Sequence, residues 1–211
     1  MTESRSVTTV VVGDRLPWLD DPSAAGDTGP FDAAVIHRGA ERRQCDVRKI
    51  SALGVTLGSE LAAALGEKVA VELGSGQRLS GEVAWTGVRE LGVRFDGSID
   101  VIALLNRNLV SQDRERRTMP RLEVRCPVHV KCGEHFDPAT LRNISSRGLQ
   151  LEGENLPAMG TYVSVFVEGL IIPPGEVVWR RDKLAGIEVF EELSWTSIIP
   201  WVRAVVKQGA N

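Results

Sequence analysis

Apolar and polar residues alternate in several short runs along the chain. Examples are Lys68–Leu73, Glu82–Trp85, Leu91–Phe95 and Tyr162–Val167, and Gly and Pro residues separate the runs. A period of two is typical of β-strands with one buried face. The links between runs are too short for helical crossovers, so the pattern predicts a mainly β protein with antiparallel strands.

Two segments have apolar residues closer to helical spacing and predict helices. One is Ile99–Leu105 and the other is Trp195–Val206. In the second segment the apolar positions are near a period of 3.6, at Ile198, Ile199, Val202, Val205 and Val206. We expect Pro200 to lie in the first turn of this helix or at a kink, because proline lacks the backbone N–H.

The chain contains an internal repeat with an offset of 94 residues. Residues 48–57 read Arg-Lys-Ile-Ser-Ala-Leu-Gly-Val-Thr-Leu, and residues 142–151 read Arg-Asn-Ile-Ser-Ser-Arg-Gly-Leu-Gln-Leu. The same offset, without a gap, relates Trp85 to Trp179. Two copies about one small domain apart predict tandem homologous domains and not a stacked array. We expect each copy to be a small antiparallel β-barrel or sandwich followed by a helix.

The repeat predicts the domain boundaries. Residues 1–30 are rich in Gly, Pro, Asp and Ser and are expected to be a partly mobile tail with one docked segment at Leu16–Leu19. The first copy is expected at 31–110 and the second at 111–211. Residues 106–121 link them.

Composition restricts the class of protein. The chain has 211 residues, 43% of them hydrophobic, and a net charge of -3, which argues against bulk electrostatic capture of nucleic acid. No apolar run reaches the length of a membrane span, and the N-terminus lacks the charged-then-apolar order of a signal peptide. Three cysteines do not form a disulfide framework. These observations predict a cytoplasmic protein without membrane insertion.

The linker carries an arginine cluster. Arg117 and Arg121 frame the sequence Thr-Met-Pro, and Pro120 disfavours helix at Met119, so we expect an extended or turning segment. Charge-rich linkers are often only solvated. Arginine, however, offers a planar fork that bonds bidentately to phosphate or to the O6 and N7 edge of guanine, and it also stacks on purines.

A second polar element follows about twenty residues later, at Asn143-Ile-Ser-Ser-Arg-Gly148. Asn143 and Ser145 occupy alternate positions, so they lie on one side if the chain is extended, and Gly148 allows a turn or close approach by a ligand. Taken alone, these residue types are typical of a structural turn.

Together, the two elements resemble the PilZ domain family. The order is Arg-x-x-x-Arg, then Asn-x-Ser-x-x-Gly, then Gly175-Glu-Val-Val-Trp and Gly186-Ile-Glu-Val-Phe190, and the resemblance covers about Arg116 to Trp201. It implies a six-stranded β-barrel with a C-terminal helix that binds cyclic di-GMP where the arginine segment meets the barrel surface.

The resemblance also implies the residues that bind the ligand. Asn143 replaces the commoner aspartate, a substitution that the family pattern allows. Arg116 stands directly before the motif, as in family members that bind an intercalated ligand dimer, so one or two nucleotides per site are both open. The implied binding residues are Arg116, Arg117, Arg121, Asn143, Ser145 and Gly148.

The first copy departs from this pattern. The offset of 94 places Ser23 and Asp27 where Arg117 and Arg121 stand in the second copy. Lys49 stands where Asn143 does, and lysine cannot accept a hydrogen bond from a guanine amino group. We expect a PilZ-like barrel that has kept the fold without the site.

Two other groups of residues contain side chains that could contact a ligand or a metal. Trp179 lies near where some family members place an aromatic side chain against the ligand, but Trp85 at the equivalent position favours core packing for both. The sequence Cys126-x-x-His-x-x-Cys-x-x-His135 has metal-ligand residue types, yet on a strand its cysteines and histidines would face opposite sides, so we expect no metal site. No catalytic motif is present, so we expect no enzyme and no cofactor.

The favoured function is a cyclic di-GMP receptor. Because its arginines lie in the linker, ligand binding is expected to change the orientation of the two domains and to signal by protein contact, for example to motility, biofilm or exopolysaccharide machinery. The alternative is a ligand-independent adaptor built of two PilZ-like barrels. A single-stranded nucleic-acid barrel is disfavoured because aromatic residues are only 5% of the chain. The downstream partner and the oligomeric state are open.

Overall fold

The computed structural model describes residues 8–19, 33–111 and 120–209, with the side chains of 108–111 and 209 left out. The chain divides into an N-terminal unit, Met1–Arg121, and a C-terminal unit, Leu122–Asn211. The boundary falls at Arg121, where the first strand of the C-terminal barrel begins. Within the described residues, neither helix is long and apolar enough to cross a membrane.

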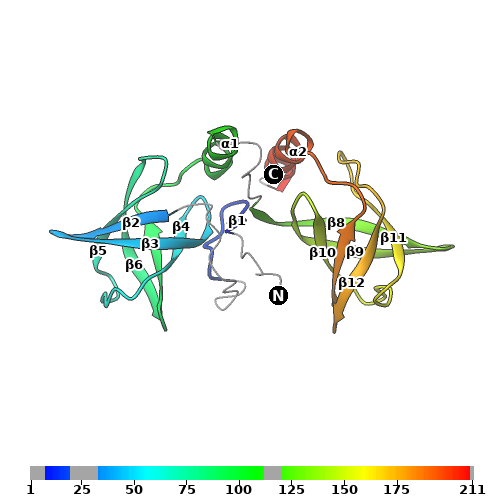
Figure 1. Ribbon diagram of the computed structural model, residues 1–211, viewed down its shortest axis with the longest axis horizontal. Coiled ribbons are helices and arrows are strands. Elements are labelled where there is room, and N and C mark those ends of the chain that lie inside the picture. Colours follow the sequence, from blue (N-terminus) through cyan, green and yellow to red (C-terminus); the bar gives the residue numbers. More distant parts are fainter. Residues whose placement is uncertain (1–7, 20–32, 112–119, 210–211) are drawn as a thin grey trace. The chain divides into compact units, whose positions relative to one another are not determined.

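The N-terminal unit contains a closed antiparallel barrel of six described strands (Figure 1). Each strand pairs with two others, in the cyclic order β2-β3-β4-β7-β6-β5 and back to β2. Helix α1 (Val101–Ser111) follows the barrel. The strands are β2 (Ala33–Arg38), β3 (Glu41–Ile50), β4 (Gly54–Gly58), β5 (Lys68–Glu72), β6 (Arg78–Gly87) and β7 (Glu90–Phe95).

The C-terminal unit repeats this architecture (Figure 1). Its cyclic order is β8-β9-β10-β13-β12-β11 and back to β8, again with antiparallel pairs throughout. Helix α2 (Trp195–Gly209) follows. The strands are β8 (Arg121–Cys132), β9 (His135–Ile144), β10 (Gly148–Glu152), β11 (Tyr162–Phe166), β12 (Gly175–Arg181) and β13 (Leu184–Val189). The predicted fold class, mainly β with barrels that are each followed by a helix, is confirmed.

The offset of 94 residues found in the sequence holds in the structure. Strands β3, β4, β5 and β7 begin and end 94 residues before β9, β10, β11 and β13. Even the irregularities repeat, because the register shifts between Val83 and Trp85 in one barrel and between Val177 and Trp179 in the other. The two barrels therefore share their strand order and two of their bulges.

Buried and exposed side chains alternate along the strands, so that apolar side chains fill the interior of both barrels. Along β8 every second residue from Leu122 to Val130 is buried, as expected for a strand with one face toward a core. Both helices begin after a capping side chain at equivalent positions, because Asp100 accepts the Ala103 N–H and Ser194 accepts the Thr196 N–H. Pro200 lies inside α2, in its second turn.

The N-terminal residues contain a strand that the sequence pattern did not predict. Residues Thr9–Val11 form β1, which pairs in parallel with the end of β3. Val10 and Val11 are fully buried. The prediction of a tail missed this strand, because three residues are too few to show a period.

Candidate functional site

The described residues of the two sequence motifs come together on the outer face of the C-terminal barrel. Leu122 of β8 and Ile144 of β9 face each other and are fully buried. Successive side chains on a strand alternate between faces, so the residues next to this pair point outward. Arg121 is exposed, and Asn143 and Ser145 are half-buried. One arginine therefore lies at the start of β8, beside the end of β9 that carries the polar motif.

The arginine segment is only partly described. Arg116 and Arg117 lie outside the described residues. Arg121 is the first residue of β8. The predicted site is thus described at Arg121, Asn143, Ser145 and Gly148.

Asn143 is held by a residue that the sequence analysis missed. It faces Gln150 across strands β9 and β10, and its Nδ2 donates a hydrogen bond to the Gln150 Oε1. An asparagine amide has a second N–H and an acceptor oxygen in addition, so this contact orients the group without using all of it. Gln150 follows Gly148 at an alternate position on β10, and that spacing was the signal for its place on the same face.

Ser145 forms the turn that joins β9 to β10. Its backbone N–H and its Oγ both donate to the Gly148 carbonyl, at 2.9 Å and 3.2 Å. The hydroxyl proton is thereby used inside the turn, whereas the Oγ lone pairs can still accept from a ligand N–H. In this geometry the Ser145 Oγ has only acceptor capacity left for a ligand.

The turn is also anchored to the rest of the barrel. The Ser146 carbonyl accepts the Leu193 N–H at 2.7 Å, just before α2, and the Arg147 carbonyl accepts the Val189 N–H at 3.1 Å, at the end of β13. The intervening side chain of Ser146 is buried. These bonds hold the loop rigidly, which is what a binding surface requires.

The N-terminal barrel makes the same backbone bonds. The Ser51 N–H donates to the Gly54 carbonyl, the Phe95 N–H to the Leu53 carbonyl and the Ile99 N–H to the Ala52 carbonyl, each at 2.9 Å. This barrel lacks the arginine pair. The turn is therefore part of the fold and does not by itself mark a binding site.

Packing against the neighbouring strand explains why residue 148 is a glycine, independently of any ligand. A Cβ added there would lie 2.5 Å from the Ile187 carbonyl oxygen, and at Gly54 in the other barrel it would lie 2.7 Å from the Val93 carbonyl oxygen. Real Cβ atoms essentially never approach so closely. Contact with the neighbouring strand requires glycine at both positions, whether or not a ligand approaches.

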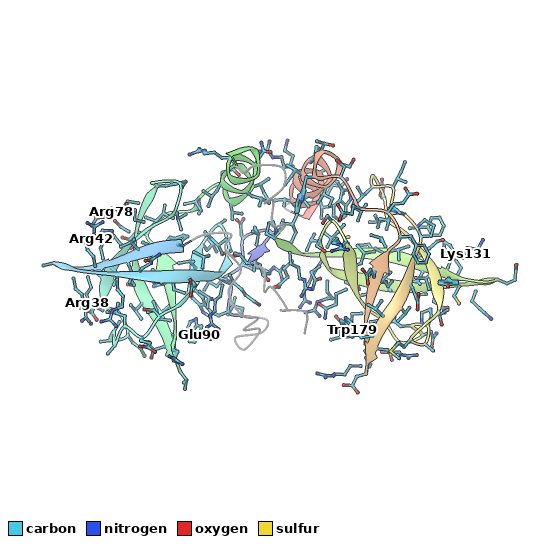
Figure 2. All side chains as sticks on the ribbon, viewed as in Figure 1. Arg38, Arg42, Arg78, Glu90, Lys131 and Trp179 are labelled. Carbon is cyan, nitrogen blue, oxygen red and sulfur yellow. The ribbon has the colours of Figure 1, made fainter. Side chains whose placement is uncertain are left out.

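Trp179 lies on β12, at the outside of the barrel (Figure 2). Its side chain is 39% exposed, and its indole ring lies over Gly186, where a Cβ would overlap the ring nitrogen. Gly186 faces Gln150 across strands β13 and β10. Core packing therefore does not account for Trp179, which extends the face that displays Asn143.

The position equivalent to Asn143 in the N-terminal barrel carries a different residue, Lys49. Lys49 faces Thr56, as Asn143 faces Gln150, but Lys49 is only 5% exposed. Strand β1 runs beside it, with Thr9 paired to Lys49. In the C-terminal barrel the neighbour at this point is instead the first part of β8.

The cysteine and histidine residues of the C-terminal barrel include one cross-strand pair, Cys132 and His135. Cys126 is buried, and burial raises the pKa of its thiol to about 11, whereas His129 and His135 are exposed. No group of three His, Cys, Asp or Glu side chains suited to a metal ion occurs among the described residues.

Comparison with known proteins gives one family and several distant structures. Residues 115–199 match the PilZ domain family. No curated protein matches the chain significantly.

Similar solved structures include the PlzA protein of Borreliella burgdorferi in complex with c-di-GMP, at 12% identity and a TM-score of 0.34, over 81% of this chain and 86% of that one. The inhibitor of motility MotI of Bacillus subtilis has 12% identity and a TM-score of 0.29, over 84% and 92%. YcgR from Escherichia coli in complex with c-di-GMP has 12% identity and a TM-score of 0.25, over 86% and 84%. At these identities and TM-scores, none of them decides what this chain binds.

The family match covers both sequence motifs and nearly the whole C-terminal barrel, and it ends within α2. The barrel that it covers has the closed six-stranded form followed by a helix that the resemblance implied. Residues 115–199 of this chain therefore match the PilZ domain family in sequence and in the form of their barrel.

Proposed function

We propose that the chain is a receptor for cyclic di-GMP and that the ligand binds on the outer face of the C-terminal barrel. The observation that carries the proposal is the placement of Arg121 at the start of β8, beside the end of β9 that displays Asn143 and Ser145. The PilZ match covers all of these residues. Arg116 and Arg117 belong to the same proposal through the family motif.

The chemistry of the face suits a guanine dinucleotide. The Arg121 guanidinium supplies a fork for a phosphate or for the O6 and N7 edge of guanine. Asn143, oriented by Gln150, offers both a donor and an acceptor to a base edge. Trp179 adds an exposed aromatic ring on the same side of the barrel. A polar face with an aromatic ring beside it suits a base that lies along it.

We further propose that the chain has one such face. Lys49 replaces Asn143 in the N-terminal barrel and is buried beside β1. Ser23 and Asp27 stand where the arginine pair is needed. The N-terminal barrel then acts as a scaffold or docking domain, and the site holds one nucleotide or an intercalated pair.

The output we propose is a contact with another protein in the cytoplasm, without catalysis. Arg117 and Arg121 belong to the segment that joins the two units, so a ligand held by these arginines would also change how the units are oriented. Only contacts that differ between the free and bound states shift such an equilibrium. The arginine contacts are of that kind.

A second candidate is an adaptor that needs no ligand, and exposed aromatic side chains favour it. Phe136 stacks on His129 with ring centroids 5.2 Å apart and lies 5.4 Å from Phe166. Phe136 and Phe166 are both about half exposed. The equivalent residues of the N-terminal barrel are Arg42 and Glu72, so the fold does not need aromatic residues there.

A second aromatic pair repeats this contrast. Tyr162 and Phe190 pack edge to face at 5.5 Å, and both are exposed. The equivalent residues, Lys68 and Asp96, form an ion pair at 3.0 Å. Exposed aromatic residues are enriched at protein interfaces. Both the receptor and the ligand-independent adaptor could use this barrel to dock another protein. A test of cyclic di-GMP binding distinguishes the two functions.

A titration of the full chain with cyclic di-GMP and with cyclic di-AMP tests the proposal. An arginine fork matches the two acceptors of guanine but not the donor that adenine places beside N7. A good pair of this kind discriminates by about 1–3 kcal/mol, so we expect roughly ten- to hundredfold tighter binding of cyclic di-GMP. Binding of neither nucleotide would favour the ligand-independent adaptor, and equal affinities would contradict the guanine-specific arginine contact.

A further inference from the structure

The first described residues of the chain cover one side of the N-terminal barrel. We call residues 8–19 the N-terminal segment. Its strand β1 lies along the end of β3, and the Thr8 Oγ1 donates to the Val47 carbonyl at 2.9 Å. Val10 and Val11 are buried by this packing. The segment is therefore an integral part of the barrel surface.

Trp18 lies near the end of the N-terminal segment and packs against the barrel. Its ring centroid lies 6.3 Å from that of Trp85, with an interplanar angle of 62°. Its six-membered ring also lies over Gly54, because a Cβ added to Gly54 would be 3.2 Å from two of the ring carbons. Trp18 thus occupies the space above Gly54 and beside Trp85.

Among the described residues, no aromatic ring pairs with the equivalent tryptophan of the C-terminal barrel. Gly148 and Trp179 are the equivalents of Gly54 and Trp85. The three heavy atoms nearest to a Cβ added to Gly148 all belong to the backbone of Ile187 and Glu188, at 2.5 to 3.7 Å. Trp179 is exposed, whereas Trp85 is half-buried. Within the described residues, the two barrels therefore differ at this surface: the Trp18 ring is among the nearest neighbours of Gly54, whereas the nearest neighbours of Gly148 are backbone atoms.

This surface of the C-terminal barrel adjoins the residues that we propose bind the ligand. Gly148 closes the turn formed by Ser145, and Trp179 lies over Gly186, the partner of Gln150. A purine placed there would lie over Gly148 and against Trp179. An indole is a planar bicyclic ring of similar size, and aromatic rings and purines stack on the same surfaces.

We propose that Trp18 is a built-in occupant of the N-terminal barrel and takes the place that a base of the ligand takes on the C-terminal barrel. This inference rests on the proposed function for the identity of that ligand. Trp18 covers the ring of Trp85, whose indole nitrogen is buried without a hydrogen-bond partner among the described residues. The N-terminal barrel is closed to nucleotide because its own chain fills the surface, in addition to its lack of the arginine pair.

The experiment uses the full chain labelled with 5-fluorotryptophan, so that each tryptophan gives one fluorine signal. Replacement of single tryptophans by phenylalanine assigns the signals. The fluorine shift difference between H2O and D2O then reports the exposure of each ring. We expect a small difference for Trp85 and a large one for Trp179, and cyclic di-GMP should shift Trp179 but not Trp85.

The decisive variant is Trp18→Ala, with Trp18→Phe as a milder change that keeps an aromatic ring and the fold. We expect the solvent shift of Trp85 to rise toward that of Trp179 in Trp18→Ala, to rise less in Trp18→Phe, and to stay constant for Trp179. Leu19→Ala removes an exposed neighbour and should change neither signal.

Either of two results would overturn the inference. One is a Trp85 signal that ignores both Trp18 variants, and the other is a Trp85 signal that cyclic di-GMP shifts in the unsubstituted chain. Failure of the proposed function looks different. In that case cyclic di-GMP shifts neither ring, while Trp85 still responds to Trp18→Ala, which confirms that Trp18 covers this surface.

Discussion

The substitution Gly148→Ala separates a role in the fold from a role in ligand approach. A Cβ at this position would lie 2.5 Å from the Ile187 carbonyl oxygen, so one backbone must move by about 0.5 Å to reach even a tight contact. Overpacking of this kind costs about 1–3 kcal/mol. For a domain of this size, each kcal/mol lowers the melting temperature by roughly 4–8 °C. We therefore expect Gly148→Ala to lower the melting temperature of the ligand-free chain by about 5–20 °C.

Differential scanning calorimetry without ligand measures this effect, and two glycines provide controls. Gly54→Ala should destabilise the N-terminal barrel similarly, because its Cβ would lie 2.7 Å from the Val93 carbonyl oxygen. Gly97→Ala should be neutral or slightly stabilising, because nothing lies within 4 Å of its added Cβ. If Gly148→Ala weakens cyclic di-GMP binding with an unchanged melting temperature, Gly148 serves ligand approach and the structural argument is wrong.

Three further predictions concern single side chains. Asn143→Lys, which installs the residue of the other barrel, should weaken cyclic di-GMP binding about 10- to 100-fold in a titration because the acceptor for the guanine amino group is lost; an affinity within twofold of the unsubstituted chain would exclude Asn143 from the site. Phe166→Glu, which copies Glu72 of the other barrel, should change the free energy of unfolding by no more than about 0.5 kcal/mol in a urea titration, because the equivalent barrel tolerates a carboxylate there; a larger loss would mean that the aromatic cluster supports the fold. Burial raises the pKa of Cys126 from 9.0 to about 11, so its contribution to stability is complete below pH 9 and is lost as the pH rises toward 11; the free energy of unfolding should fall more steeply over this range than in Cys126→Ala, and parallel pH profiles would contradict the shift.

The sequence predicted the tandem barrels because the repeat and the period of two are both strong signals. Strand β9 begins 94 residues after β3, as the offset requires, and both helices occur where apolar spacing changed. The short strand β1 escaped prediction because three residues show no period, and its burial depends on contact with β3.

The sequence predicted some residues of the candidate site and missed others, and the difference has a physical reason. Asn143 and Ser145 could be predicted because polar residues between apolar residues can be recognised in the sequence alone. Gln150 and Trp18 could not, because their roles come from neighbours across a strand pair or across a barrel surface. The steric need for Gly148 is also hidden in the sequence, since the atom that it avoids is on β13.

The central claim is that this chain binds cyclic di-GMP through the arginine motif of its C-terminal barrel, and isothermal titration calorimetry of three variants tests it most directly. Arg117→Ala and Arg121→Ala remove the proposed ligand contacts, whereas Arg78→Ala removes an exposed arginine of β6 in the other barrel (Figure 2). We predict saturable binding to the unsubstituted chain, unchanged affinity in Arg78→Ala, and at least a tenfold loss in each motif variant, as expected when a charge-assisted bidentate contact is removed. No heat with cyclic di-GMP, or an affinity that is the same in all three variants, would contradict the account.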